Sequence, residues 1–465
     1  MMKVLRFSIL AALTVALSTT PAWSAIEFFG TAKVKPTYYS NFDFDDSQPD
    51  TAALNEAGWA SGEHIRSEVR LGWKASGEKW RIKMIAEGDL IYNKNNADRS
   101  FYVGAEDANG LPNAGSEFGI ERAEFGYTFA PALDFSTGWD IRALDIKSGG
   151  LLYGDDHPFI GLKGALAEKT KYELLYIPIQ NSEAIGVSDS TKTGDWRVYS
   201  LKLSQGIGGL TLSPLVAFSD NTAKQAQITY YGLELTGEAG AFKPAFEIVG
   251  SDGDFENGTD ISSLAMFAGA ELMVNKAFKP YLAVRYAQGD DDTGDGEAEG
   301  WVGITDIGRF TPLMGMDGNI LGEHLASGAS IYNSPLYSFS PDRAVGGNAY
   351  GGIGNGSSGN NPGQKLFAIG ASGDLGAVAP ALLYKAQAFL IWYDDTTNLT
   401  NVRTPGEDVD EYAGTTFDLQ LLWAASKNFS VDYIFSAFDP GEGIEDQVDA
   451  DDTAFAHTLT FAWAY

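Results

Sequence analysis

Along most of the chain, hydrophobic and polar residues alternate one by one. In the stretch KWRIKMIAEGDLIY (79–92), Trp80, Ile82 and Met84 fall on one side, whereas Arg81 and Lys83 fall on the other. The same two-residue period recurs in 64–75, 122–129, 416–423 and 428–438, and helical periodicity is nearly absent. Because successive side chains of a strand point to opposite faces, this pattern predicts an all-β protein whose strands each have one apolar and one charged face.

The connections between the alternating segments also follow a pattern. Short turns alternate with longer, polar and mostly acidic segments, which gives eight short turns, nine long connections and 18 strands. A count of 16 strands is the alternative, because residues 159–180 alternate poorly. Strands of about ten residues with long loops at one rim and tight turns at the other are typical of a transmembrane antiparallel β-barrel. We therefore expect long extracellular loops and short periplasmic turns; the short turns are expected at 76–79, 131–134, 167–170, 205–209, 237–241, 275–278, 373–377 and 426–428.

The last strand continues to the final residue. In HTLTFAWAY (457–465), large apolar residues occupy every second position; they are Leu459, Phe461, Trp463 and Tyr465. In a membrane every backbone polar group needs a partner, so a sheet must close on itself. We expect this strand to pair with the first one, residues 26–39. A β-sandwich and a β-helix are the soluble alternatives, but the chain shows no short fixed repeat.

The composition and the first 24 residues further limit the class of protein and its partners. The 465-residue chain has no cysteine, and its 44% of apolar residues with a mean hydropathy of -0.14 do not match a helical membrane protein. Residues 1–24 have the positive start, apolar centre and small residues of a signal peptide. Residues 25–465 are then one barrel domain with 30 Lys and Arg against 62 Asp and Glu. A net charge of -32 disfavours nucleic acid as a partner, since phosphate binding needs a basic surface.

If the aromatic faces meet lipid, the opposite faces line a pore. The expected pore-lining residues are Arg66, Glu68, Arg70, Lys74, Arg81, Lys83, Glu87, Asp89, Arg122, Glu124, Asp140, Arg142 and Arg285. Two interpretations remain open: ion pairs that brace a wide barrel, or a constriction whose charges select solutes. The basic excess on the second to fifth strands is small, so it predicts either mild anion preference, against the charge of the whole protein, or a transverse field with little net selectivity.

Two loops are candidates for narrowing the pore. KSGGLLYGDDHPFIG (147–161) follows the fifth strand and offers Tyr153, Asp155, Asp156 and His157 as constriction residues. Residues 290–363 form a much longer connection, and loops of such length are usually functional or disordered.

Acidic runs at 289–300, 406–412 and 441–452 are expected to form a solvated outer rim. Divalent-cation binding is the alternative: 291–296 has part of a calcium-loop spacing, although Val302 replaces the glutamate of its twelfth position. No other metal site or cofactor is expected. The histidines His64, His157, His324 and His457 form no catalytic constellation with a nucleophile, so we expect no enzyme activity.

The terminal stretch LTFAWAY resembles the C-terminal signature of Gram-negative outer-membrane β-barrel porins. The resemblance implies an integral outer-membrane protein, surrounded by lipid and lipopolysaccharide, whose last strand is read by the barrel-assembly machinery. YGDDHPFIG and FTPLMG are also similar to loop motifs of the alginate-export family of porins, which implies an 18-stranded barrel with a charged pore.

The leading functional hypothesis is a porin that passes small hydrophilic solutes. A specific exporter or importer of an anionic saccharide is the second hypothesis. A surface adhesin, or a barrel sheath around an electron-carrier partner, is the third. The sequence leaves a monomer and a homotrimer equally open.

Overall fold

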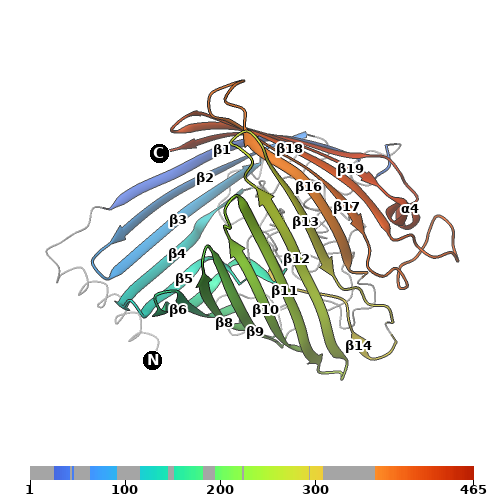
Figure 1. The fold of residues 1–465 in the computed structure, drawn as a ribbon, viewed down its shortest axis with the longest axis horizontal. Helices are drawn as coiled ribbons and strands as arrows, with labels where there is room; N and C mark the ends of the chain where they lie inside the picture. The colour runs from blue at the N-terminus through green and yellow to red at the C-terminus, as the bar shows by residue number, and fades with distance from the viewer. Residues whose placement is uncertain are drawn as a thin grey trace.

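The computed structural model describes residues 26–41, 44–46, 63–91, 116–144, 151–181, 194–222, 225–292, 294–306 and 362–465. Their strands form one continuous sheet that curves round and closes on itself, so that the first and last strands lie side by side (Figure 1). The predicted signal peptide, residues 1–24, lies outside the described residues. The FTPLMG stretch lies outside them too.

Eighteen long strands make the wall, and each pairs antiparallel with its neighbours. The first nine are β1 (Glu27–Ser40), β2 (Glu63–Ser76), β3 (Trp80–Ile91), β4 (Ser116–Ala130), β5 (Leu133–Ala143), β6 (Tyr153–Ala167), β7 (Thr170–Gln180), β8 (Trp196–Ile207) and β9 (Leu210–Asn221). The other nine are β10 (Ala226–Gly237), β11 (Phe242–Phe255), β12 (Asp260–Leu272), β13 (Lys279–Ala287), β16 (Gln364–Asp374), β17 (Leu382–Trp392), β18 (Tyr412–Ser426), β19 (Phe429–Pro440) and β20 (Ala454–Ala464). The predicted 18-stranded barrel is confirmed.

Three further elements lie in the connections. β14 (Glu297–Ala298) and β15 (Thr305–Asp306) are two-residue strands between β13 and β16. The short helix α4 (Glu442–Val448) lies between β19 and β20. Among the described residues, no helix is long and apolar enough to cross a membrane.

The eight short turns occur at the expected places, but two of the other connections are shorter than predicted. Residues 222–225 join β9 to β10, and residues 256–259 join β11 to β12. The polar residues around them continue the strands instead, because their backbones pair as far as Asn221–Ala226 and Asp254–Asp260. The sequence suggested longer loops because polarity alone does not end a strand.

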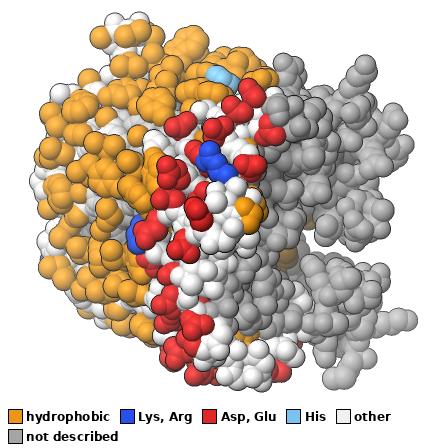
Figure 2. All heavy atoms as spheres, turned by 90° about the vertical axis from the view of Figure 1, so that its right-hand side faces the viewer, with side chains coloured by type: hydrophobic (Ala, Val, Ile, Leu, Met, Phe, Trp, Pro, Cys, Tyr) orange, Lys and Arg blue, Asp and Glu red, His pale blue; other side chains and the backbone are white. Residues whose placement is uncertain are grey.

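Apolar side chains cover the outside of the barrel. On β4, Ile120, Phe125, Tyr127 and Phe129 are exposed. Such exposure is what strands that face lipid require. Figure 2 shows this apolar wall, with acidic side chains gathered along the border with the loops. We name this border the long-loop rim, and the opposite border the short-turn rim.

The barrel closes where β20 pairs with β1, as the sequence predicted. Val34 lies opposite Phe461, and Ala32 lies opposite Trp463. At the end of the strand, Tyr465 and Gly30 exchange two backbone hydrogen bonds of 3.2 and 3.3 Å. The end of the Tyr465 ring lies within 2.5 Å of where a Cβ on residue 30 would be, so a side chain at this position would have to displace that ring.

A closed, lipid-facing barrel predicts a specific behaviour on extraction. The purified protein should need detergent, give a β-type circular dichroism spectrum, and migrate differently on a gel before and after boiling. This result follows because the hydrogen-bonded wall has no free edge from which unfolding can start. A helical spectrum, or a protein that stays dispersed without detergent, would contradict the barrel.

Candidate functional site

Charged side chains line the inside of β1 to β5, and we call this set the charged wall. Its ion-paired members are Lys33, Glu68, Arg70, Arg81, Lys83, Glu87, Glu121, Arg122, Glu124, Asp134, Asp140 and Arg142. They point inward because they alternate with the exposed apolar residues of the same strands.

Arg70 is the centre of the first group of ion pairs. Its guanidinium lies 3.5 Å from Glu68 and 3.1 Å from Glu121, and its Nε donates a hydrogen bond to Glu87. Lys33 on β1 approaches the same Glu68 at 3.1 Å. One cation therefore links carboxylates from three neighbouring strands, β2, β3 and β4.

The ion pairs continue from Glu121 towards β5. Arg122 lies 2.8 Å from Glu121 and 3.7 Å from Asp140, and Asp140 also pairs with Lys83. Positive and negative groups thus alternate around this part of the wall.

A second group connects β3, β4 and β5. Arg81 donates two hydrogen bonds to Asp134, of 2.8 and 2.9 Å, in the forked geometry that suits a carboxylate. Arg81 also lies 3.4 Å from Glu124, whose other oxygen accepts a 3.0 Å hydrogen bond from Arg142. The Arg142 guanidinium lies over the Phe159 ring at 3.7 Å from its centroid, which fixes its orientation.

The remaining predicted pore-lining residues have other positions. Lys74 pairs with Glu27 at 2.9 Å, and both side chains are exposed near the short-turn rim. Arg285 is buried on β13 and donates a hydrogen bond to Gln364. Arg66 is on β2 and Asp89 is on β3, but their side chains lie outside the described part of the structure.

The predicted loop is wrong for residues 153–161 of the stretch 147–161, and residues 147–150 lie outside the described part of the structure. Tyr153, Asp155, Asp156 and His157 belong to strand β6, which begins at Tyr153. The reason is register: residues 154–163 pair with β5, so the polar GDDH run is held in an extended ladder. The Tyr153 hydroxyl lies 3.1 Å from Nδ1 of His157, and Tyr153 is buried.

Several charged partners in this wall were not predicted from the sequence. Glu121 would face lipid in a regular strand, but a β-bulge between the Ile85–Arg122 and Ala86–Ile120 pairs turns it inward. Lys33, Asp134 and the Lys202–Glu234 pair, at 2.6 Å, were also missed. Alternation along β1 and β10 would have indicated Lys33 and Glu234; nothing in the sequence marks the bulge.

Residues 297–306, which we call the inward segment, cross the inside of the barrel. The segment begins where β14 pairs with β12 and ends where β15 pairs with β6. Between these points, the hydroxyl of Tyr230 on β10 donates a 3.2 Å hydrogen bond to the carbonyl of Val302. Tyr230 is fully buried whereas its neighbour Tyr231 is 54% exposed on the outer face, so Tyr230 points into the barrel.

Trp301 fixes the middle of the inward segment. Its side chain is fully buried, and its Nε1 donates a 3.2 Å hydrogen bond to the carbonyl of Leu151. The Tyr230 ring meets it edge-on at 6.0 Å between centroids. The Ile304 amide donates a 2.7 Å hydrogen bond to the carbonyl of Leu152. Of the two loops predicted to narrow the pore, the described part of 290–363 therefore runs inward.

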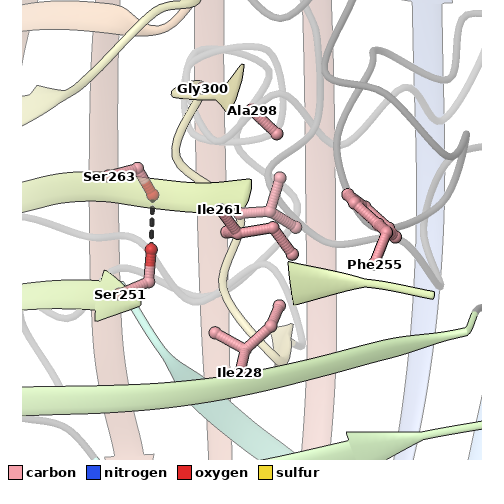
Figure 3. Close-up of a pocket in the computed structure, with 8 residues that line it drawn as sticks. Ile228, Ser251, Phe255, Ile261, Ser263, Ala298 and Gly300 are labelled. Atoms are coloured by element: carbon pink, nitrogen blue, oxygen red, sulfur yellow. Dashed lines mark hydrogen bonds between the residues drawn. The ribbon is translucent and has the colours of Figure 1, made fainter. Parts of the chain in front are cut away.

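A small apolar pocket separates the inward segment from the wall (Figure 3). Ile228, Phe255 and Ile261 line it from the wall, and Val302 lines it from the segment. Its one polar feature is the pair Ser251 and Ser263, whose hydroxyls are 2.6 Å apart and satisfy each other. The segment is thus held on this side by apolar packing together with the backbone pairing of β14 with β12.

The long-loop rim carries a further group of carboxylates. Asp45, Asp46 and Asp452 place oxygens within 4.8 Å of one another, a spacing that a metal ion could bridge. The negative charge of Asp452 raises the pKa of Asp46 above its usual range. These carboxylates are partly or fully exposed, and they form one acidic patch of the rim.

The fold and the site together define a class: a closed 18-stranded barrel with an apolar outside, a charged inner wall and an inward segment, which is the architecture of outer-membrane porins. No protein-family model matches the sequence, and no curated protein sequence matches it.

Solved structures match the fold over nearly the whole chain. OccAB4 of Acinetobacter baumannii is 12% identical, with a TM-score of 0.57 over 96% of this chain and 100% of that chain. OccK2 (OpdF) of Pseudomonas aeruginosa, solved in complex with glucuronate, is 12% identical, with a TM-score of 0.52 over 94% and 97%. OpdK of Pseudomonas aeruginosa, solved with vanillate, is 9% identical, with a TM-score of 0.53 over 94% and 98%. At this identity the similarity establishes the fold.

Proposed function

We propose that this protein is a channel of the bacterial outer membrane that passes small hydrophilic solutes through a charged, narrowed pore. The observation that carries the proposal is the combination of a lipid-type outer face with the charged wall and the inward segment inside one closed barrel. An 18-stranded barrel is wide enough to hold an aqueous passage. In this proposal residues 1–24 are removed and residues 25–465 form the single barrel domain in lipid and lipopolysaccharide.

Conductance across a planar lipid bilayer tests this function. Purified barrels should produce stepwise single-channel currents, and the reversal potential in a salt gradient should report their selectivity. An adhesin or a sheath around an electron carrier would insert into the bilayer without reproducible steps. The Tyr230→Phe variant is a useful reference for these currents. It keeps the charged wall and loses only the hydrogen bond from Tyr230 to Val302 in the inward segment.

The charged wall also favours a second candidate function, in which the channel passes small solutes that carry a carboxylate. Two of the similar structures were solved with glucuronate and with vanillate, a sugar acid and an aromatic acid. A carboxylate can replace a wall carboxylate at Arg70 or Arg81, since guanidinium groups bind planar anions with two hydrogen bonds. Glucuronate should therefore reduce the ion current more than glucose at equal concentration; equal effects would contradict this candidate.

Replacing wall arginines should shift selectivity towards cations. In the Arg70→Ser, Arg81→Ser double variant, Glu87 and Asp134 lose their principal cations, whereas Glu68 keeps Lys33. One unpaired charge about 7 Å from the ion path is worth about 0.6 kcal/mol in water, or about threefold in local cation concentration. The reversal potential should move accordingly, and Lys243→Ser, which changes a cation near the short-turn rim, should not move it.

This experiment distinguishes the two interpretations of the wall. If the double variant assembles and its selectivity is unchanged, the arginines only brace the wall. Control of passage would then belong to the inward segment or the acidic rim.

A further inference from the structure

A lysine and a glutamate form an ion pair on the inner face of β8 and β10, away from the charged wall. Nζ of Lys202 lies 2.6 Å from Oε2 of Glu234 and donates a 2.7 Å hydrogen bond to its Oε1. Glu234 is only 4% exposed, and in the described part of the protein Lys202 is the only cation that pairs with it. Replacing a buried ion pair with apolar residues often costs no stability, so this pair is expected to do more than fill the wall.

The same ammonium group has a further partner outside these two strands. Lys202 Nζ donates a 2.9 Å hydrogen bond to the carbonyl of Leu144. Leu144 directly follows β5, and β8 is three strands further along the wall. Lys202 points into the barrel, because its neighbour Leu203 is exposed on the outer face. The end of the β5–β6 hairpin therefore extends inside the barrel as far as the side chain of a β8 residue.

This end of the hairpin is also where the inward segment is attached. The Leu144 amide donates a 3.1 Å hydrogen bond to the carbonyl of Tyr153, so the two strands stay paired up to these residues. The carbonyls of Leu151 and Leu152 accept the hydrogen bonds from the inward segment that are described above. Tyr153 itself pairs with β15, the last part of that segment. The inward segment is thus bonded to the hairpin end, and the hairpin end is bonded to Lys202.

The two partners of Lys202 have different effects. The bond to Leu144 is charge-assisted, and such bonds are about twice as strong as bonds between neutral groups. Glu234 restricts the ammonium group, which a flexible four-carbon stem would otherwise allow to move. The pair is not needed to join β8 to β10, because β9 already pairs with both of these strands. The contact that explains a buried charge at this place is therefore the one with Leu144.

We propose that Lys202, held by Glu234, is a positioning residue that fixes the end of the β5–β6 hairpin inside the barrel and, through it, the inward segment. The width of the passage then depends on a side chain that lies outside the charged wall. This role rests on the proposed channel function for its effect on the current, whereas the attachment of the segment is measured without any current.

The Lys202→Met, Glu234→Gln double variant tests the attachment. Methionine keeps an unbranched side chain, and glutamine removes the charge that would otherwise be buried without a cation, so the barrel should assemble. Loss of one hydrogen bond from a charged donor should raise the population of the detached hairpin end about tenfold to a hundredfold. Hydrogen exchange of the Leu144 and Ile304 amides, measured by mass spectrometry in detergent, should become faster by a similar factor, because exchange of a bonded amide requires local opening.

Single-channel recordings test the consequence for the passage. The double variant should spend more time at conductance levels above that of the intact channel, because a detached segment no longer narrows the pore. Lys202→Arg is the conservative variant, since it keeps a charged donor for both Glu234 and Leu144. It should show the exchange rates and the conductance of the intact protein, a rescue that a charge acting only within the wall would not produce in the amides of the segment.

Lys243→Met with Glu238→Gln is the matched control, because it removes a 3.0 Å ion pair of the same two residue types near the short-turn rim. It should change neither measurement. Unchanged exchange at Leu144 and Ile304 in the assembled Lys202→Met, Glu234→Gln barrel would overturn the proposal and assign the pair to the wall alone. Faster exchange in that variant, with no current from any of the proteins, would support the positioning role and contradict the channel function instead.

A second variant keeps the test decisive if the first gives no heat-modifiable barrel. Lys202→Met with Glu234→Leu replaces the pair by apolar residues of similar volume, a change that buried ion pairs often tolerate. The Leu144 carbonyl again loses its donor. Exchange of the same two amides at the rate of the intact protein would reject the role of Lys202.

Discussion

Replacing Phe461 and Trp463 together with Ser is expected to reduce assembled barrel in the outer membrane to near background. Both residues lie on the closing strand β20, where Phe461 is opposite Val34 and Val431, and Trp463 is opposite Ala32 and Phe429. The Trp463 and Phe429 rings are 5.0 Å apart between centroids, and Trp463 is exposed on the outer face. Each substitution removes about 2 kcal/mol of the free energy that is gained when apolar surface leaves water.

The same substitutions remove the C-terminal stretch that resembles the signature of Gram-negative outer-membrane barrels. Heat-modifiable protein in isolated outer membranes is the measurement. Thr458→Ser with Thr460→Ser is the matched control, since both threonines are on the buried face of the same strand and keep their hydroxyls. Normal amounts of folded Phe461→Ser, Trp463→Ser protein would show that the outer apolar row of β20 is dispensable for assembly.

Trp301→Ala should release the inward segment and increase single-channel conductance. The substitution removes a fully buried indole, its hydrogen bond to Leu151 and its edge contact with Tyr230. Loss of a buried tryptophan side chain costs about 3–5 kcal/mol, which is comparable with what three or four hydrogen bonds contribute. The segment should therefore detach locally while the 18-stranded wall remains paired.

Trp301→Phe is the companion variant, because it keeps ring packing and loses only the Nε1 donor. Its conductance should lie close to that of the intact channel. Conductance that is the same in all three proteins would show that the inward segment does not limit the passage of ions, and the charged wall would then remain the principal barrier.

The barrel could be predicted from the sequence because the two environments of each strand determine the polarity of nearly every residue in it. Lipid on one side and water on the other impose a two-residue period that holds for strand after strand. The inward positions of Arg70, Arg81 and Arg142 follow from that period alone. The ion-pair partners of these arginines do not follow from the period. Arg81 is on β3 and Asp134 is on β5, and only the register of β3, β4 and β5 brings the two side chains together.

The failures of prediction have local causes. Glu121 was missed because one inserted residue shifts the alternation within β4. Asp155 and His157 were placed in a loop because polar residues resemble loop residues, whereas backbone pairing with Arg142 and Asp140 makes them strand. The path of the inward segment depends on contacts between residues 72 and 150 positions apart, such as Tyr230–Val302 and Leu151–Trp301, which no local pattern encodes.

The junction of β1 with β20 also determines the order in which the barrel can form. Asn41 and Thr453 are hydrogen-bonded across it although 412 positions separate them in the chain. Bringing together the ends of so long a segment costs about 5 kcal/mol of chain entropy, against about 1–2 kcal/mol for a tight hairpin. We therefore expect the hairpins to form before the junction, so that β1 and β20 are the last strand edges to pair, and unpaired edges are prone to aggregation.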